Sequence, residues 1–289
     1  MSMFKHTALA LAIAGLAGCA TVNVDQSMGS INQSTSAMTQ GKVTLALNDE
    51  QRNKLREQAD ELLKNPLSPN STVELMLLNS PDFQALLARG YADAALAAQS
   101  GRIANPIFNF ERITVGDELE IGRLFSFGLL DLITLPWRQQ AATTRIERAH
   151  LLLAGDVIGQ VAQARGAWVD AVVARQKAQY AERVYENAQA SAELAKRMEE
   201  VGNFTISQRI RQQMFYSEAA LGLAMARQEA LASREKLARI VGLDDQQMAR
   251  LQLPDRLPNL PDTVKDAKEV SAQATNRLDV QIAKQAYDA

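Results

Sequence analysis

The sequence has very few of the residue types on which most catalytic and redox sites depend. It contains one cysteine, Cys19, and two histidines, His6 and His150, among 289 residues. A single cysteine excludes a disulfide within the chain. No Ser/His/Asp or Cys/His set, no metal-ligand spacing and no glycine-rich phosphate loop can be assembled. We therefore expect no catalytic residues, no metal site and no cofactor, and the chain is not expected to be an enzyme.

Excess charge and long hydrophobic runs are also missing. The formal net charge is −2, so nothing indicates nucleic acid as a partner. Beyond the first residues there is no run of about eighteen apolar residues, which excludes a transmembrane helix and leaves β-strands as the means of crossing a membrane. Aromatic residues are only 5% of the chain although hydrophobic residues are 47%. Alanine makes up the difference, and alanine favours closely packed helices.

The first nineteen residues have the pattern of a secretory leader. Lys5 and His6 are followed by the apolar stretch from Ala8 to Ala17, which is too short to span a bilayer. The ending Leu16-Ala17-Gly18-Cys19 resembles the lipobox of bacterial lipoproteins, in which the leader is removed and the cysteine is lipidated. We predict a signal peptide at 1–18 and a lipid on Cys19; an ordinary cleaved signal is the alternative.

The segments before residue 105 read as a tether and two helical regions. Residues 19–47, rich in Ser, Thr, Gln and Asn, are expected to form a flexible tether attached to the lipid. Residues 48–104 predict helices. The first is capped by Asn48, and a capping box at Ser71–Glu74 is expected to open the second, with an interruption near Pro81.

Residues 105–135 change from helical to alternating apolar periodicity. Phe108 and Phe110 fall on one side of a first run, and a turn at Gly116-Asp117 leads into a second. Each run has roughly the nine to eleven residues of a tilted membrane-spanning strand. A soluble hairpin packed on a core is the alternative, and Arg123 on the apolar face favours it. The residues expected to face lipid are Phe108, Phe110, Leu119, Ile121, Phe125 and Phe127.

Residues 136–243 predict a long antiparallel helical hairpin. From Pro136 to Glu200 there is no further proline, and about 65 helical residues would extend about 100 Å. Apolar residues recur at steps of three and four, the heptad spacing of a coiled coil. The outgoing row is Leu153, Val157, Val161, Ala164, Trp168 and Ala171, then Ala178, Ala181, Tyr185, Ala188, Ala192 and Ala195; the returning row is Ile210, Met214, Ser217, Leu221 and Ala224.

Several motifs occur in the order and spacing of a known family. Asn79-Ser80-Pro81-Asp82-Phe83 precedes the first strand, Leu135-Pro136-Trp137 joins the second strand to the long helix, Val201-Gly202-Asn203-Phe204-Thr205 forms the hairpin tip, and Leu237-Ala238-Arg239-Ile240-Val241-Gly242 ends the return helix. From about Leu67 onward this arrangement resembles the outer-membrane efflux protein (TolC) family, in its lipoprotein branch.

The resemblance implies a mainly α fold: a periplasmic α-barrel element made of the helical hairpin, plus two strands of an outer-membrane β-barrel. It implies a homotrimeric duct that exports small molecules or ions in a tripartite efflux system, with a periplasmic adaptor linking it to an inner-membrane transporter. The tip residues expected to meet the adaptor are Gly202, Asn203, Phe204, Thr205 and Ser207, although any helix turn could use Gly-Asn; Gln208 stands where many relatives have an acidic residue.

The chain departs from the family in length. It holds one complete repeat, and residues 244–289 contain a linker and the start of a second, where Asn276–Gln281 echoes Ser80–Gln84. We therefore expect a C-terminally truncated member, lipid-anchored at the outer membrane because Ala20 replaces an inner-membrane retention aspartate, with most of the chain in the periplasm. The alternatives are a periplasmic structural coiled-coil lipoprotein and the duct of a type I secretion system.

Overall fold

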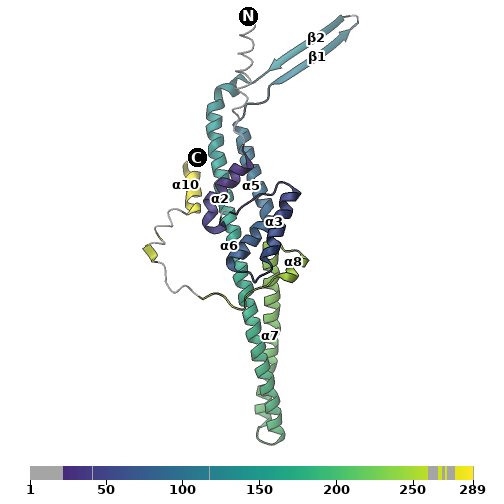
Figure 1. Cartoon of the computed structure of the whole chain (residues 1–289), viewed down its shortest axis with the longest axis vertical. Helices are drawn as coiled ribbons and strands as arrows, with labels where there is room; N and C mark the ends of the chain where they lie inside the picture. Colours follow the sequence, from purple (N-terminus) through teal and green to yellow (C-terminus); the bar gives the residue numbers. More distant parts are fainter. Residues whose placement is uncertain are drawn as a thin grey trace. The chain divides into compact units, whose positions relative to one another are not determined.

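The computed structural model describes residues 22–40, 42–116, 118–259, 266–268, 271 and 277–288. The predicted leader and the lipidation site at Cys19 lie outside these residues. Figure 1 shows a mainly helical chain with one pair of strands. The elements are α2 (Val24–Thr39), α3 (Asp49–Leu62), α4 (Pro69–Asn79), α5 (Pro81–Ser100), β1 (Ile107–Val115), β2 (Glu118–Ser126), α6 (Leu129–Glu200), α7 (Ile206–Val241), α8 (Asp245–Arg250) and α10 (Leu278–Asp288).

The chain divides into two compact units, each described by itself. The first comprises Met1–Ser34, Leu87–Gly155 and Asn276–Ala289 and contains the strand pair. The second comprises Thr35–Leu86 and Asp156–Thr275 and contains α3, α4, α7 and α8. Helix α6 begins in the first unit and ends in the second, and its 72 residues correspond to about 108 Å of helix.

The predicted helical hairpin is confirmed in the second unit. Helix α7 runs antiparallel to α6, and ion pairs join the helices at Lys177–Glu229 (3.1 Å) and Glu182–Arg227 (2.7 Å). The whole first part of the predicted row on α6, from Leu153 to Ala171, is buried. In the alanine-rich part, Ala188 and Ala195 are also buried. Heptad spacing therefore identified the correct face of α6.

The predicted row on α7 is wrong, because that helix has two apolar stripes on opposite sides. Ile210, Met214 and Leu221 are 45%, 58% and 64% exposed, so this row faces outward. The buried row is Ala219, Leu223, Leu237, Ala238 and Val241. The buried row mixes small and large side chains, and α7 packs against α4 as well as α6. Periodicity locates such stripes but does not say which one packs within the chain.

Helix α6 also begins earlier than predicted, at Leu129 rather than Pro136. Proline inside a helix leaves the carbonyl four residues earlier without its donor. Here that carbonyl belongs to Leu132, an exposed residue, so water can satisfy it. The Arg138–Asp131 ion pair (3.0 Å) spans the proline and stabilises the helix on both sides of it.

The prediction of a flexible tether is wrong for residues 24–39, which form helix α2. Ile31 is fully buried and Met28 is 7% exposed, so the helix packs despite its polar composition. Its hydroxyl groups are satisfied locally: Thr39 donates to the Thr35 carbonyl oxygen (3.1 Å). Such local bonds let a Ser/Thr-rich helix bury polar side chains at low cost, and composition does not reveal them.

The capping box of the second helical segment lies earlier than predicted. Ser68 is the N-cap of α4: its side chain accepts from the Ser71 backbone, and Ser71 bonds back to the Ser68 N–H (2.7 Å). Pro69 occupies the first helical turn, where its missing N–H costs nothing. The sequence Ser68-Pro69 was therefore the better start signal. The break at Ser80-Pro81 and the Asn48 cap of α3 are confirmed.

A polar junction joins α3, α4, α7 and α8 in the second unit. The Asn79 side-chain amide donates to the Gly242 carbonyl oxygen (2.7 Å) and to Gln247 Oε1 (2.9 Å). Gln247, only 2% exposed, donates in turn to Asp60 (3.0 Å). This bond and Arg250 lower the pKa of Asp60, so the junction is held by an ionised carboxylate.

Candidate functional site

The strand pair is the first candidate site, and it lies within the predicted range 105–135 with its turn at Gly116. Both strands have nine residues and pair antiparallel, with Phe108 opposite Phe125 and Phe110 opposite Arg123. Gly116 adopts φ +60° at the turn, a conformation that glycine accommodates without strain. Directly opposite residues share a face, so Phe108, Phe110, Leu119, Ile121 and Phe125 lie on one side, as predicted. Phe127 lies just beyond β2 and contacts Phe125, with ring centroids 6.0 Å apart.

The strand pair does not pack on a core formed by the described residues. Phe108, Phe110 and Phe125 are 61%, 58% and 60% exposed, and every strand residue whose side chain is described is exposed. This contradicts the alternative of a soluble hairpin packed on a core. A lone two-stranded hairpin is marginally stable in water at best. The strands are therefore suited to a partner outside the described chain.

The pairing register of the two strands shows that the predicted apolar face also carries charged residues. Arg112 lies opposite Ile121 and joins Arg123 on the face that carries the phenylalanines, while the other face contains Ile107, Ile113 and Leu124. Aromatic side chains are concentrated at the end of the hairpin that connects to the helices, which we call its root. Charged side chains are concentrated toward the turn. The apolar surface is therefore most continuous near the root.

Arg138 holds that root and was not identified from the sequence. Its guanidinium donates to the carbonyl oxygens of Ser100 (3.2 and 3.1 Å) and Arg102 (2.9 Å), at the end of α5, and to Asp131 (3.0 Å). One side chain therefore joins the segment entering β1 to the helix that follows β2. The only sequence signal was an arginine directly after Pro136-Trp137.

The tip of the helical hairpin is the second candidate site, and it is built around Gly202. The Gly202 N–H donates to the Glu199 carbonyl (2.9 Å) and the Asn203 N–H donates to that of Met198 (2.8 Å). This is a Schellman motif, which needs a left-handed residue after the helix. Gly202 has φ +76°, and a Cβ built there would meet nothing within 4 Å. The glycine is thus required by the backbone and not by crowding.

One of the remaining tip residues, Thr205, caps α7 together with Gln208. The Thr205 hydroxyl accepts from the Gln208 N–H (3.3 Å), and Gln208 Oε1 accepts from the Thr205 N–H (2.8 Å). Among the described residues, the side chains of Asn203 and Ser207 make no hydrogen bond. Val201 is 68% exposed. The structure brings all five predicted tip residues together, and Asn203 and Ser207 keep free polar groups.

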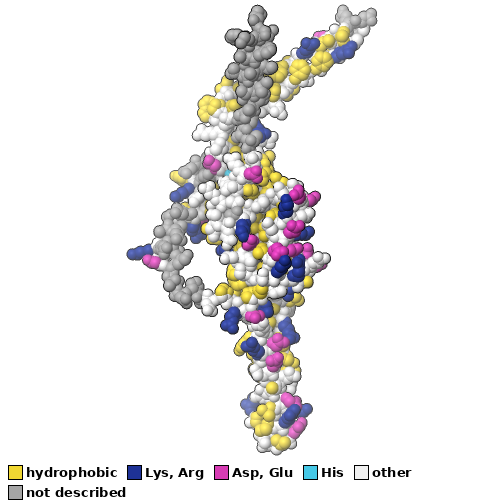
Figure 2. Space-filling view, viewed as in Figure 1, with side chains coloured by type: hydrophobic (Ala, Val, Ile, Leu, Met, Phe, Trp, Pro, Cys, Tyr) yellow, Lys and Arg dark blue, Asp and Glu magenta, His cyan; other side chains and the backbone are white. Residues whose placement is uncertain are grey.

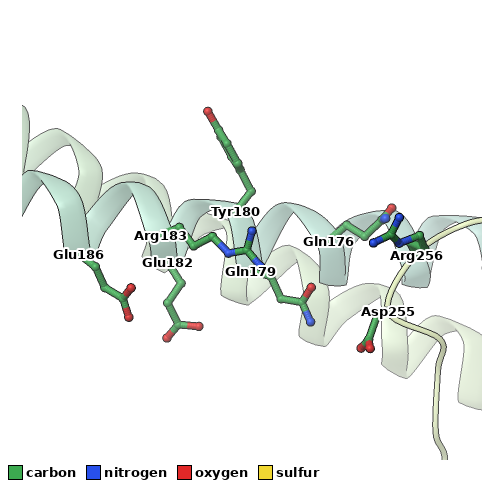
Figure 3. A pocket seen from close by; sticks show the side chains of 8 residues that line it. All are labelled: Gln176, Gln179, Tyr180, Glu182, Arg183, Glu186, Asp255 and Arg256. Carbon is green, nitrogen blue, oxygen red and sulfur yellow. The ribbon is translucent and has the colours of Figure 1, made fainter.

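An open groove in the second unit has no catalytic arrangement. It is an open hollow of about 780 Å³ beside α6. In Figure 3, Tyr180 points to the opposite side from Glu182 and Glu186. Among the described residues no group of His, Cys, Asp and Glu could hold a metal ion. The groove is lined by Gln176, Gln179, Tyr180, Glu182, Arg183, Glu186, Asp255 and Arg256.

His150, the histidine on α6, is not a fully solvated residue. It is half-buried, and its Nε2 lies 3.3 Å from the hydroxyl of Ser27 on α2. Burial lowers the pKa of His150, and nearby Glu147 opposes that shift. The neutral imidazole is thus favoured where α2 meets α6 in the first unit.

In the described part of the chain no helix combines the length and apolar character that a membrane span requires.

Comparison with known proteins identifies the fold. No protein-family model and no curated protein matches the sequence. Among solved structures, CusC, described in terms of transmembrane channel formation, matches with a TM-score of 0.57 at 16% identity over 75% of this chain and 53% of its own. The Campylobacter jejuni CmeC outer membrane channel matches with a TM-score of 0.51 at 15% identity, over 84% of this chain and 55% of its own.

A third match is the outer-membrane channel OprN, with a TM-score of 0.50 and 19% identity over 86% of this chain and 57% of its own. The chain therefore spans about half the length of the structures it matches. Its expected character as a non-enzyme agrees with these neighbours, which are channel proteins. The chain has the fold of the TolC-type outer-membrane channels over that half of their length.

Proposed function

We propose that this chain is a component of an outer-membrane efflux duct, exporting small molecules or ions from the periplasm to the exterior. Strands β1 and β2 contribute to the membrane barrel, and the helical hairpin contributes to a periplasmic duct assembled from several copies, a homotrimer in the full-length family. The lipid on Cys19 anchors the chain at the outer membrane. The tip meets a periplasmic adaptor that connects to an inner-membrane transporter.

The observation that carries the membrane assignment is the exposed strand pair. Nine-residue strands match the bilayer thickness when tilted, and each strand has an unpaired edge that a barrel would satisfy. The long stems of Arg112 and Arg123 allow their guanidinium groups to reach polar headgroups. A periplasmic spacer would have no use for such an apolar hairpin.

The outward stripe of α7 supports assembly from several copies. Ile210, Met214 and Leu221 form a heptad-spaced row with no partner among the described residues. A helix with apolar stripes on opposite sides is typical of a helix packed on both. The row therefore suits a neighbouring helical hairpin in a closed ring.

Extraction of membranes tests the proposed role of the strands. In a Cys19→Ser variant the lipid is missing, so only the protein can hold the chain in the membrane. We expect this variant to resist extraction with alkaline carbonate. Release into the soluble fraction would contradict the channel proposal and favour a tethered periplasmic coiled coil.

A matched pair on β1 sharpens that experiment. Phe110→Arg, in the Cys19→Ser background, adds a third arginine to the phenylalanine face and should release the chain, at a cost of about 2–4 kcal/mol near the bilayer middle. Asn109→Arg places the same charge one residue away, on the opposite face. It should remain in the membrane fraction. Equal release of both variants would contradict the assigned lipid face.

Adaptor docking is tested at the hairpin tip. Gly202→Val should abolish drug tolerance in a strain that depends on this duct, with protein level and lipidation unchanged. Gly222→Val is the control, because a side chain there also meets nothing within 4 Å and lies away from the tip on α7. Unchanged drug tolerance in Gly202→Val would refute the docking role.

A further inference from the structure

The first turns of α6 carry an apolar surface that the described residues leave open. Leu129, Leu130, Ile133 and Trp137 are 64%, 72%, 58% and 67% exposed. Phe127, which is 58% exposed, precedes them directly. Figure 2 shows hydrophobic side chains at the start of α6 as well as along the strand pair. From the sequence, Phe127 was expected to face lipid and Trp137 to belong to the joint between strand and helix, whereas Leu129, Leu130 and Ile133 had no assigned role.

Helix geometry gathers these residues on one side. At about 100° per residue, the exposed apolar side chains occupy a continuous arc of about 160°. In order around the helix, this arc holds Leu132, Pro136, Leu129, Ile133, Trp137 and Leu130. The opposite arc holds Thr134, Arg138, Asp131 and the half-buried Leu135.

The charges of this segment are turned away from the apolar arc. Asp131 and Arg138 form an ion pair of 3.0 Å, and Arg138 also donates to the carbonyl oxygens of Ser100 and Arg102 at the end of α5. The apolar arc therefore contains no charged group. Burying an unpaired charge is the main free-energy cost of moving a protein surface into an apolar medium. Moving this arc would bury none.

We infer that this arc lies in the interface of the bilayer, with the ring of Trp137 at the level of the lipid headgroups. We call the arc with Phe127 the α6 collar: Phe127, Leu129, Leu130, Leu132, Ile133, Pro136 and Trp137. The inference rests on the proposed membrane role of β1 and β2. The collar follows directly from the aromatic root of that hairpin, with only Gly128 between Phe127 and Leu129. Tryptophan prefers membrane interfaces because its ring is apolar and its N–H is polar.

The shape of the collar favours lipid over a second helix. A coiled-coil seam is narrow and is commonly flanked by charges. The outward row of α7 has that character, since Arg211 and Glu218 lie beside Ile210 and Leu221. The collar is wider and has no flanking charge of its own. A continuous acyl surface can cover such an arc, as it covers one side of an interfacial amphipathic helix.

Depth-dependent quenching tests the collar. The chain has two tryptophans, and Trp168 is 2% exposed and donates to the Leu67 carbonyl oxygen (2.8 Å). The full lipidated chain with Trp168→Phe is placed in phosphatidylethanolamine–phosphatidylglycerol vesicles brominated either near the headgroup or near the acyl ends. We expect Trp137 emission to fall in both, and further with the shallow bromines. Emission unchanged by either lipid, as expected if a second copy covers the ring, would overturn the inference.

A second comparison protects the result against misfolding of that variant. The emission of Trp137 is also obtained as the difference between the unsubstituted chain and Trp137→Phe, in which Trp168 is retained. That difference should be quenched in the same depth order. The residual emission of Trp137→Phe should not respond to bromine. Equal quenching of Trp168 would overturn the assignment to the collar.

The outcome is distinguishable from failure of the proposed function. If carbonate retains the Cys19→Ser chain but Trp137 is not quenched, the strands are in the membrane and the collar inference is wrong. If carbonate releases that chain but Trp137 of the lipidated chain is quenched, the barrel role fails and the start of α6 contacts lipid without it.

Discussion

Two glycines with the same backbone conformation provide a direct test of the structure. Gly242 follows α7 with φ +75°, and Gly202 follows α6 with φ +76°. A Cβ at Gly242 would lie 2.7 Å from Ser80 Cα and 2.9 Å from the Asn79 carbonyl oxygen, both backbone atoms. A Cβ at Gly202 would meet nothing within 4 Å. Replacing each by alanine therefore separates backbone strain from crowding.

The expected magnitudes follow from these two contributions. A left-handed alanine costs about 1–2 kcal/mol, and this applies to both positions. Overpacking against atoms that cannot move adds about 1–3 kcal/mol at Gly242 alone. Gly202→Ala should thus lower the free energy of unfolding by about 1–2 kcal/mol, and Gly242→Ala by about 2–5 kcal/mol.

The assay is equilibrium urea unfolding of the detergent-solubilised chain, followed by helical circular dichroism. Part of the stability lost in Gly242→Ala is expected to come from weaker hydrogen bonds in the polar junction that contains Asn79 and Gln247. Equal destabilisation by the two substitutions would refute the close packing of Gly242 against the start of α5. A larger loss at Gly202 would refute the open tip.

Three further predictions follow from single contacts. Burial lowers the pKa of His150, so the folded chain resists its protonation; stability is complete above about pH 6.5 and declines below it, and His150→Gln should remove this decline in the unfolding midpoint. Tyr216→Phe deletes the hydroxyl contact with Tyr185 (3.1 Å) and should cost about 0.5–1.5 kcal/mol in urea unfolding, less than Tyr216→Ala, which also removes the ring contact. Ile31→Ala should cost about 2–5 kcal/mol of packing and expose α2 to limited proteolysis, whereas Met38→Ala, at a position 40% exposed, should not; equal cleavage would contradict the packing of α2.

Local signals predicted those parts of the fold that depend on neighbours in the sequence. The alternation within residues 105–135 located the strand pair, because β-strand side chains repeat every two residues. Gly202 and Gly242 marked the helix ends, and both have the left-handed backbone that a helix C-terminus favours. The buried row from Leu153 to Ala171 was predicted because α6 has one dominant stripe there.

Features that depend on distant contacts were missed. The packing of α2 depends on Ile31 and on hydroxyls bonded within the helix, and a polar composition conceals both. The buried side of α7 is decided by packing against α4 and α6, which are remote in sequence. Arg138 acts through carbonyl oxygens at the end of α5, and no pattern in the sequence marks that pairing.

The candidate sites were predicted to a similar extent. The five tip residues do lie together, but their capping roles became clear only from the hydrogen bonds of Thr205. The phenylalanine face was predicted, whereas the presence of Arg112 on it needed the register. The α6 collar was not predicted, because the sequence placed the start of the helix at Pro136 and not at Leu129. The residues before Pro136 were therefore not expected to share a helical face.

Labelling of single cysteines on intact cells tests the central claim most directly. Glu120→Cys places an exposed thiol near the turn of the strand pair, on the face opposite the phenylalanines, and Ser207→Cys places one at the tip of the helical hairpin. With Cys19 lipidated, a membrane-impermeant maleimide should label Glu120→Cys on intact cells, and Ser207→Cys only after the outer membrane is permeabilised. Labelling of Glu120→Cys only after permeabilisation would place the strand pair in the periplasm and contradict the account.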